Sequence, residues 1–174
     1  MSEPDAPTDG GRHAAREDVT GLVVSRFDPP HLGHSYLVDA ALDRCDRVAV
    51  YVNSGPPDAV PGPLRVAWLS ELHPDAVVVE VAHDLHTDFA DEALWQRWIE
   101  LFRRHWPFEH GPDVVCSSDP YVTELAARLG AEAVVVDADR VTVPISATMV
   151  RTDPAAHLHR LAPPVRAWVE ANWL

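Results

Sequence analysis

Lysine is absent from this chain of 174 residues, and all 14 basic residues are arginine. The absence excludes Schiff-base chemistry and the lysine-dependent phosphate loop of many nucleotide-hydrolysing enzymes. Basic residues are also few against 27 acidic ones, and the net charge of −13 argues against a general nucleic-acid binder, which needs a basic face. Any site for a phosphate must therefore be locally basic.

Cysteine and long apolar runs are also scarce. Cys45 and Cys116 lie far apart with no C-x-x-C spacing, which predicts buried free thiols rather than a disulfide or a thiolate metal site. No apolar run approaches the roughly 18–20 residues of a membrane span, and the polar, acidic start of the chain is unlike a secretory signal. Two histidine pairs, at residues 83–86 and 157–159, lack convergent carboxylates or cysteines. We therefore expect a cytoplasmic protein without a metal site of its own and without a membrane partner.

The length fits one domain with a hydrophobic core, because domains commonly hold about 100–200 residues. Residues 1–18 mix proline, glycine and charge without apolar periodicity, which predicts a flexible N-terminal tail. Residues 19–174 are then expected to form the single folded domain.

Short valine-rich runs alternate with longer amphipathic stretches from residue 19 onward. The runs predict buried parallel strands at 19–24, 48–52, 77–81, 114–116 and 133–136. The stretches between them predict helices at 33–43, 63–72, 91–105 and 120–129, with Gly130 ending the last, and one or two short helices within 154–174. The alternation predicts an α/β fold, with a Rossmann-like parallel sheet of about five strands and helices on both faces.

The first chemical motif, Ser-Arg-Phe-Asp-Pro-Pro-His-Leu-Gly-His at residues 25–34, lies between the first strand and the first helix. Anions bind beyond the carboxyl ends of parallel strands, where helix N-termini offer free N–H groups. His31 and His34 would share one side of the first helical turn, and Gly33 lets the backbone approach closely. A lone His-x-x-His is more often a surface pair, but this position favours a polyphosphate site.

The second motif, Pro-Ile-Ser-Ala-Thr-Met-Val-Arg at residues 144–151, follows the last strand. Ser146 is a suitable helix N-cap, which puts Thr148 and Arg151 in the first turns of the helix. Residues 140–151 contain two arginines and no acidic residue, so this segment can hold an anion in an otherwise acidic protein. Alone the motif is weak, because a capped helix with one exposed arginine explains it equally well.

Together the two motifs resemble the signatures of the nucleotidyltransferase superfamily, G-x-F-x-P-x-H-x-G-H and I-S-x-T-x-[IV]-R. Ser25 stands where the family has its first glycine, and Ala147 where glycine or serine is common. The residues that match the first signature are Phe27, Pro29, His31, Gly33 and His34.

The resemblance is closer to one branch, the nicotinamide-mononucleotide (NMN) adenylyltransferase domain of bifunctional NAD-salvage proteins of the NadR type. Three further segments carry it, at residues 117–121, 136–140 and 143–146, and it covers roughly residues 19–174. It implies the reaction of ATP with NMN to give NAD and pyrophosphate, by in-line transfer without a covalent intermediate. The chain has no G-x-x-x-x-G-K-[ST], so the kinase activity of those proteins is not expected.

Positions that match the family motifs or flank them are assigned roles at the triphosphate. His31, His34 and Arg151 are the expected catalytic residues, with His34 nearest the transferring phosphoryl group. Mg²⁺ is expected to be held mainly by the triphosphate of ATP, because this hard ion prefers phosphate and water oxygens. The expected nucleotide-binding residues are Arg26, Phe27, Asp28, Gly33, Ser118, Asp137, Arg140, Ser146 and Thr148.

Candidates for the acceptor site are Arg65, Trp95 and Trp98. A tryptophan beyond a strand end could stack on a cationic nicotinamide ring, and Arg65 could bind the acceptor phosphate. The helical spacing of the two tryptophans also fits plain core residues, and Arg65 could simply pair with a surface carboxylate.

Two other functions stay open from the sequence. Because of the departures at Ser25 and Ala147, one alternative is an adenylyl- or cytidylyltransferase that uses ATP or CTP on another phosphate or phosphonate acceptor. A catalytically inactive nucleotide-binding regulator is the alternative from another class. In each case the expected partners are small nucleotides rather than nucleic acid. The sequence does not decide the oligomeric state, and a homo-oligomer is one possibility.

Overall fold

A computed structural model describes residues 18–174. The expected flexible tail falls outside this range except for Asp18. Within the described range, no helix is long and apolar enough to cross a bilayer. Cys45 and Cys116 are buried free thiols, as expected.

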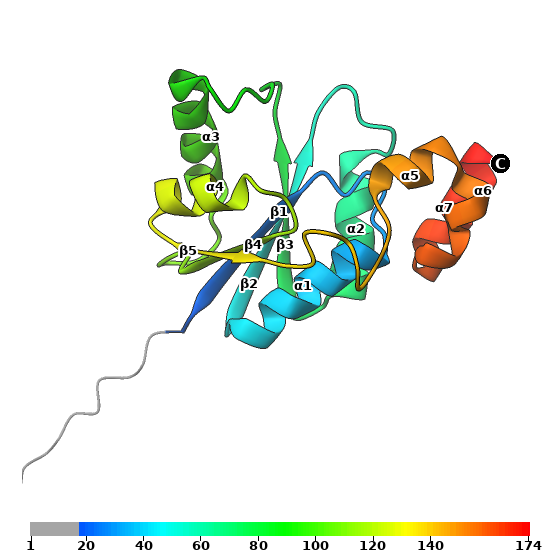
Figure 1. The fold of residues 1–174 in the computed structure, drawn as a ribbon, viewed down its shortest axis with the longest axis horizontal. Helices are drawn as coiled ribbons and strands as arrows, with labels where there is room; N and C mark the ends of the chain where they lie inside the picture. The colour runs from blue at the N-terminus through cyan, green and yellow to red at the C-terminus, as the bar shows by residue number, and fades with distance from the viewer. Residues whose placement is uncertain (1–17) are drawn as a thin grey trace, which may run out of the picture.

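Five parallel strands form one sheet in the order β3-β2-β1-β4-β5 (Figure 1). The inner strands β1, β2 and β4 are buried, as their valine runs predicted. The edge strands β3 and β5 are mostly intermediate or exposed, so the prediction of burial was wrong for these two, which have a neighbouring strand on one side only. The fold is therefore the expected Rossmann-like α/β sheet. The strands are β1 (Thr20–Ser25), β2 (Arg47–Ser54), β3 (Ala76–Ala82), β4 (Val114–Ser117) and β5 (Glu132–Val135).

Helices cover both faces of the sheet. They are α1 (Leu32–Arg44), α2 (Gly62–Leu72), α3 (Glu92–His105) and α4 (Val122–Leu129). Successive strand side chains point to opposite faces. Val23 and Val50 accordingly lie in one hydrophobic cluster with α1 and α2, whereas Leu22 and Tyr51 lie in another with α3 and α4. Gly130 ends α4 with a left-handed φ of 75°, as the sequence predicted.

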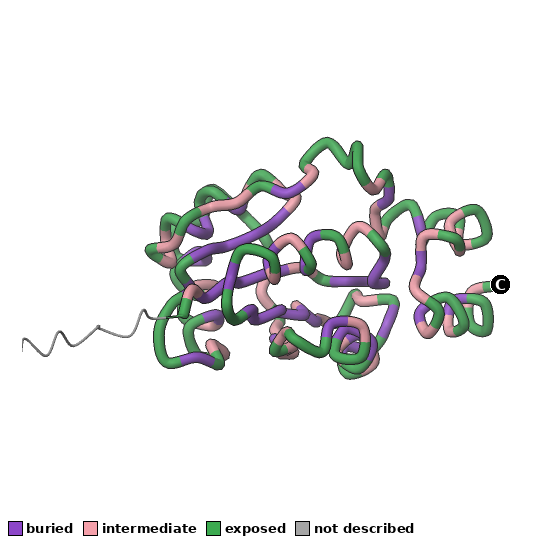
Figure 2. The backbone as a smooth tube through the Cα atoms, turned by 90° about the horizontal axis from the view of Figure 1, so that it is seen from below, coloured by how far each residue is buried: buried purple, intermediate pink, exposed green. Residues whose placement is uncertain are grey.

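The C-terminal part is a group of short helices: α5 (Ala147–Thr152), α6 (Pro154–His157), the 3-10 turn η1 (Leu158–Arg160) and α7 (Pro163–Trp173). Their apolar residues form a third cluster with α2, in which the rings of Trp68 and Trp168 meet edge to face at 5.9 Å. Figure 2 shows buried strands in the middle of the molecule and these helices, largely exposed, at one end. The cluster packs α5 and α7 against α2.

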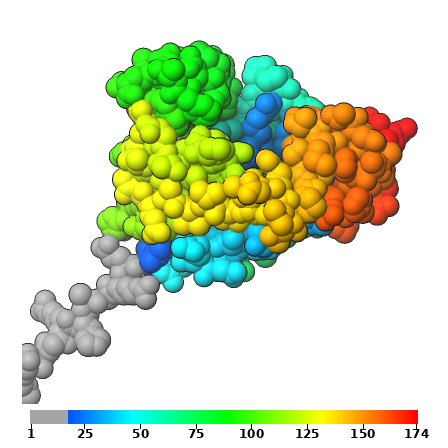
Figure 3. Space-filling model, viewed as in Figure 1, coloured from blue at the N-terminus to red at the C-terminus, as the bar shows by residue number. Residues whose placement is uncertain are grey.

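The strand order reverses at β1, whose neighbours are β2 on one side and β4 on the other. In such sheets ligands bind in the crevice beyond the strand ends at this point of reversal. Ser25 ends β1 and Ser117 ends β4, so the crevice opens between them. In the space-filling view, blue atoms of the β1–α1 segment reach the surface between the green α3 region and the orange α5 region (Figure 3).

Candidate active site

Two histidines of the β1–α1 turn cap the helix that follows them. His31 is the N-cap of α1, and its Nδ1 accepts the backbone N–H of His34 at 3.3 Å. Nδ1 of His34 accepts the backbone N–H of His31 at the same distance, which completes a reciprocal capping box. The two rings are stacked with centroids 3.7 Å apart, and both residues line the crevice.

The same hydrogen bonds fix which ring nitrogen carries the proton. Because both Nδ1 atoms accept a backbone N–H, each neutral ring holds its proton on Nε2. Burial, and then the charge of Arg140, lower the pKa of His31 to about 4. Burial and the neighbouring His31 ring hold the pKa of His34 well below its usual value. Near pH 7 both rings are therefore neutral N–H donors, a state suited to phosphate oxygens.

Gly33 allows this ring pair to pack against the loop before α5. A Cβ at this position would lie 3.0 Å from Nδ1 of His31 and 3.3 Å from Cγ2 of Ile145. Either contact is tight, so a larger residue would displace the ring. The glycine thus leaves room for the second motif to lie against the first.

Phe27 and Asp28 lie behind the histidines rather than in the crevice. Phe27 is fully buried, with its ring centroid 4.7 Å from that of His34. The carboxylate of Asp28 is buried and accepts the backbone N–H groups of Ala59 and Val60 at 2.9 and 2.8 Å. The sequence analysis put both residues among the nucleotide-binding residues; neither lines the histidine pocket described below.

The second motif meets the first through Arg151. Its guanidinium donates to the backbone oxygen of Asp28, across 123 positions of sequence, and to Oγ1 of Thr148 at 3.3 Å. Ser146 caps α5 as expected, because its hydroxyl accepts the N–H of Met149 at 3.2 Å. Arg151 keeps 36% of its side chain exposed, so it can still reach an anion at the mouth of the crevice.

A loop held by Asp137 supplies the other arginine of the crevice. The Asp137 carboxylate accepts the N–H groups of Val141, Thr142 and Val143 at 2.9, 2.9 and 3.0 Å. These bonds, that of Thr142 first, hold the pKa of Asp137 below its usual value. Both of its oxygens thus hold the loop, while Asp137 also lines the cavity described below. Arg140, within the loop, lies 3.7 Å from the Asp119 carboxylate and lowers the pKa of both histidines.

These elements line one cavity of about 190 Å³, which we call the histidine pocket. Its walls come from the end of β1, the start of α1, the loop after β4, the Asp137 loop and the start of α5. It brings together most of the residues expected at the triphosphate, Ser118 included. The expected residues that line it are His31, Gly33, His34, Ser118, Asp137, Arg140, Ser146 and Thr148.

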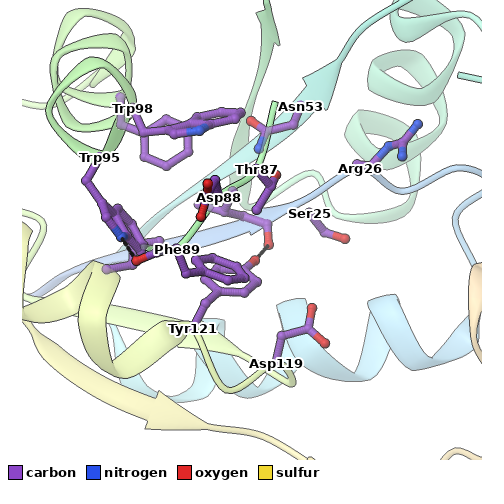
Figure 4. Close-up of a pocket in the computed structure, with 13 residues that line it drawn as sticks. Ser25, Arg26, Asn53, Thr87, Asp88, Phe89, Trp95, Trp98, Asp119 and Tyr121 are labelled. Carbon is purple, nitrogen blue, oxygen red and sulfur yellow. Dashed lines mark hydrogen bonds between the residues drawn. The ribbon is translucent and has the colours of Figure 1, made fainter. Parts of the chain in front are cut away.

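A second cavity of about 280 Å³, the aromatic pocket, lies on the α3 side of β1. Trp95, Trp98, Phe89 and Tyr121 supply its aromatic walls, and Tyr121 donates from its hydroxyl to the backbone oxygen of Val24 at 3.1 Å (Figure 4). Both expected tryptophans therefore line a cavity while their other faces join the core. The two pockets share Val24, Ser25 and Asp119 and so form one continuous crevice.

Arg65 is buried behind Arg26 and Asn53, which line the aromatic pocket, without lining that pocket itself. Its side chain is fully enclosed and donates to the backbone oxygens of Arg26 and Asn53 and to the Asp58 carboxylate. The sequence analysis offered two roles for Arg65, binding of the acceptor phosphate and pairing with a carboxylate; in the structure it pairs with Asp58 and links the end of β1 to β2 and α2. Arg26 lies at the rim of the aromatic pocket, where it pairs with the other oxygen of Asp58.

The sequence analysis did not identify several of the residues that line the pockets. Ser25 was noted only as a departure from the family glycine, but its Oγ lies 3.3 Å from Nε2 of His34. Asn53 near the end of β2 and Asp88 in the loop after β3 line the aromatic pocket. Both follow the rule that ligands gather at the carboxyl ends of parallel strands, so that rule applied to every strand would have found them.

The fold and the crevice define an α/β protein of the Rossmann type, with its crevice at the point where the strand order reverses. Residues 22–153 match the cytidylyltransferase-like family, which covers most of the described chain. The chain belongs to this cytidylyltransferase-like family.

Known relatives agree with that class. The chain is 38% identical over 84 residues to a probable nicotinate-nucleotide adenylyltransferase of Cereibacter sphaeroides, a match over 44% of this chain and 45% of the relative. The chain thus spans less than half the length of that relative.

Solved structures share the fold. NadR protein in complex with NR superposes with a TM-score of 0.61 at 22% identity, over 82% of this chain and 43% of that one. A bifunctional NMN adenylyltransferase/ADP ribose pyrophosphatase from Francisella tularensis gives 0.52 at 15% identity, over 70% of this chain and 38% of that one. At these identities the likeness concerns the fold alone.

Proposed function

We propose that this protein is a nucleotidyltransferase that joins the adenylyl group of ATP to a pyridine mononucleotide, NMN foremost, with release of pyrophosphate. One observation carries the proposal: a phosphate-type pocket and an aromatic pocket meet at Ser25 and Asp119, beside Nε2 of His34. The reaction needs two anionic nucleotides in one line, and the crevice offers one place for each.

The histidine pocket suits the triphosphate. In the proposed reaction a phosphate oxygen of the acceptor attacks the α-phosphorus of ATP, a new P–O bond forms, and the bond to the bridging oxygen of pyrophosphate breaks. The acceptor phosphate is already ionised, so no residue has to remove a proton. Nε2–H groups of His31 and His34 would donate to the phosphoryl oxygens, while Arg140 and Arg151 would balance the charge of the leaving pyrophosphate.

ATP would enter with Mg²⁺ on its phosphate oxygens. Among residues 18–174 no three histidine, cysteine or acidic side chains gather into a metal site. The carboxylates that line the histidine pocket, Asp119 and Asp137, lie singly, and Asp137 accepts hydrogen bonds from its own loop. We therefore propose that phosphate and water oxygens supply most ligands of the ion, which reduces the charge of the triphosphate.

The aromatic pocket favours a flat acceptor over a small phosphonate. Trp95, Trp98 and Phe89 give it planar apolar walls, on which a pyridinium ring can stack. A short aliphatic phosphonate would leave these walls uncovered. Arg26 at the rim is placed to meet the acceptor phosphate once it leaves Asp58.

The test is pyrophosphate release by purified protein with Mg²⁺, with ATP or CTP, and with a panel of acceptors. The panel holds NMN, its nicotinate analogue, and an aliphatic phosphate and phosphonate. We expect release with ATP and a pyridine mononucleotide, and formation of the matching dinucleotide. Release only with CTP or an aliphatic acceptor would replace the acceptor we propose, and ATP binding without any release would indicate a regulator.

A histidine variant separates chemistry from folding. His34→Ala should lower kcat by about 10²–10³, the usual cost of a lost donor to developing charge. His159→Ala, an exposed histidine of the C-terminal helices, is the matched control and should keep full turnover. Equal turnover of the two variants would remove His34 from the site.

A further inference from the structure

The polar lining of the aromatic pocket is acidic. Asp88 and Asp119 contribute carboxylates, and Arg26 is the one basic residue among the described residues that line it. Arg26 is paired with Asp58, and Figure 4 shows it at the opposite side of the pocket from Trp95. The basic residue of the lining is therefore at the far end from the tryptophans.

Two further basic side chains lie against the tryptophans without lining the pocket. The guanidinium of Arg128 lies 4.8 Å from the centre of the Trp95 ring, where it is already paired with two glutamates. The ring of His83 meets that of Trp98 edge on, and burial lowers the pKa of His83, so this ring is neutral near pH 7. Neither supplies a free positive charge to a ligand at the tryptophan end.

The two carboxylates differ in their surroundings. Asp119 lies 3.7 Å from the Arg140 guanidinium, which offsets its charge. Asp88 is exposed in the free protein and has no ion pair with any residue from 18 to 174; Figure 4 shows it with Thr87 among the residues that line the pocket. A ligand seated between the aromatic walls would thus meet one uncompensated negative charge.

The position of Asp88 is fixed by the tryptophans themselves. The indole N–H of Trp98 donates to the backbone oxygen of His86 at 3.1 Å, and that of Trp95 donates to the backbone oxygen of Phe89 at 3.2 Å. Oδ1 of Asp88 accepts the N–H of Ala90 at 2.9 Å, while Oδ2 accepts from no donor in the described part of the chain. The loop is therefore held on both sides of Asp88, with one carboxylate oxygen available to a ligand.

We infer that Asp88 makes the aromatic pocket selective for pyridine nucleotides with an uncharged amide over those with a carboxylate on the ring. The inference rests on the proposed function and names its substrate class. An N-ribosyl pyridinium ring is cationic, which suits a pocket with a nearby carboxylate, and a carboxamide can donate its N–H to Oδ2. A nicotinate carboxylate would face Asp88 as a like charge without a cation to share. The selectivity is opposite to the acid substrate named for the Cereibacter sphaeroides relative.

The experiment compares kcat/KM for NMN and nicotinate mononucleotide in three proteins: the wild type, Asp88→Asn and Asp84→Asn. The substitution at Asp88 keeps a side-chain oxygen for the N–H of Ala90 and removes only the charge. Asp84, exposed on the same loop and outside the pocket, is the matched control. We expect the wild type to favour NMN by at least about tenfold, the effect of one like-charge contact once a bound ring covers the Asp88 carboxylate. Asp88→Asn should reduce that ratio by about tenfold, through a gain with the nicotinate form, and Asp84→Asn should keep it.

A binding measurement separates this inference from the proposed reaction. Quenching of tryptophan fluorescence by each mononucleotide reports occupancy of the aromatic pocket without any turnover. Amide-selective quenching that Asp88→Asn abolishes would support the inference even if no pyrophosphate were released, an outcome that would overturn only the proposed reaction. A wild-type preference for the nicotinate form, an unchanged ratio in Asp88→Asn, or no binding of either mononucleotide would overturn the inference.

Discussion

The hydroxyl of Ser25 lies 3.3 Å from Nε2 of His34, at the junction of the two pockets. Nε2 carries the ring proton, because Nδ1 already accepts the N–H of His31. Ser25 thus accepts the same N–H that a phosphate oxygen would accept. A residue that departs from the family glycine is therefore in contact with the histidine nearest the proposed chemistry.

We predict that Ser25→Ala lowers kcat by about three- to tenfold, with little change in the KM for ATP. The reason is the loss of one hydrogen bond of roughly 0.5–1.5 kcal/mol that orients the His34 ring. Steady-state kinetics at saturating acceptor measures the effect, and Ser70→Ala, exposed on α2, is the control. A rise in kcat would show instead that Ser25 obstructs the phosphates.

Protonation of His31 should make the protein less stable in acid. Its pKa is about 4 in the folded state against 6.5 for the unfolded chain, so between these values the unfolded chain holds more protons. The free energy of unfolding should therefore fall as the pH falls from 6.5 to 4, by up to about 3 kcal/mol from this residue. His34 acts in the same direction, because its pKa is also lowered.

The measurement is urea unfolding at pH 7, 6, 5 and 4 for the wild type and His31→Asn. Asparagine is itself a good N-cap, so the variant keeps α1 while removing the titrating ring. The stability difference between the two proteins should shrink steadily toward pH 4. A constant difference across this range would mean that His31 titrates normally in the folded protein.

We predict that Arg65 contributes to the free energy of unfolding rather than to acceptor binding. Arg65→Met removes hydrogen bonds to two backbone oxygens and leaves Asp58, which is mostly buried, without one of its two cations. Loss of one partner of a buried pair commonly costs about 3–5 kcal/mol. We expect a matching fall in the urea midpoint, and an unchanged acceptor KM in the fraction that stays folded at low temperature. A variant of wild-type stability with weakened acceptor binding would return Arg65 to the acceptor site.

The main features of the fold follow from the sequence because they depend on local patterns. Valine runs set the strands, and Gly130 could adopt the left-handed φ that ends α4. The two motifs were also recognisable, because a strand followed directly by a helix defines where an anion can bind. Their contact, from Arg151 to Asp28, is a long-range property that only the folded chain reveals.

Burial was the property that the sequence could not supply. Arg65 looks like any other arginine at a helix start, yet its side chain is fully enclosed. Phe27 and Asp28 stand within the first motif but are turned into the core. No sequence motif around Asp88 indicates a site residue. It lines the pocket because two tryptophans of α3 hold its loop. In each case tertiary contacts decide which way a side chain points.

The Asp137 loop gives a prediction about residues that act together. Asp137 and Arg140 both adopt left-handed backbone angles, with φ of 48° and 50°, which cost about 1–3 kcal/mol each unless other contacts hold them. Here the Asp137 carboxylate holds the loop through three backbone N–H groups. If Asp137 serves the nucleotide only by placing Arg140, Asp137→Ala should raise the KM for ATP about tenfold, as should Arg140→Ala, because one charged contact is lost in each.

A double-mutant cycle distinguishes this positioning role from direct binding by Asp137. Residues that act through one contact show non-additive losses. We therefore expect the protein with both substitutions to have about the same KM for ATP as the single variant with the higher KM. Additive losses, about a hundredfold together, would mean that Asp137 contacts the nucleotide on its own, as the sequence first suggested. Asp139→Ala, in the same loop but outside the histidine pocket, is the control and should leave the KM for ATP unchanged.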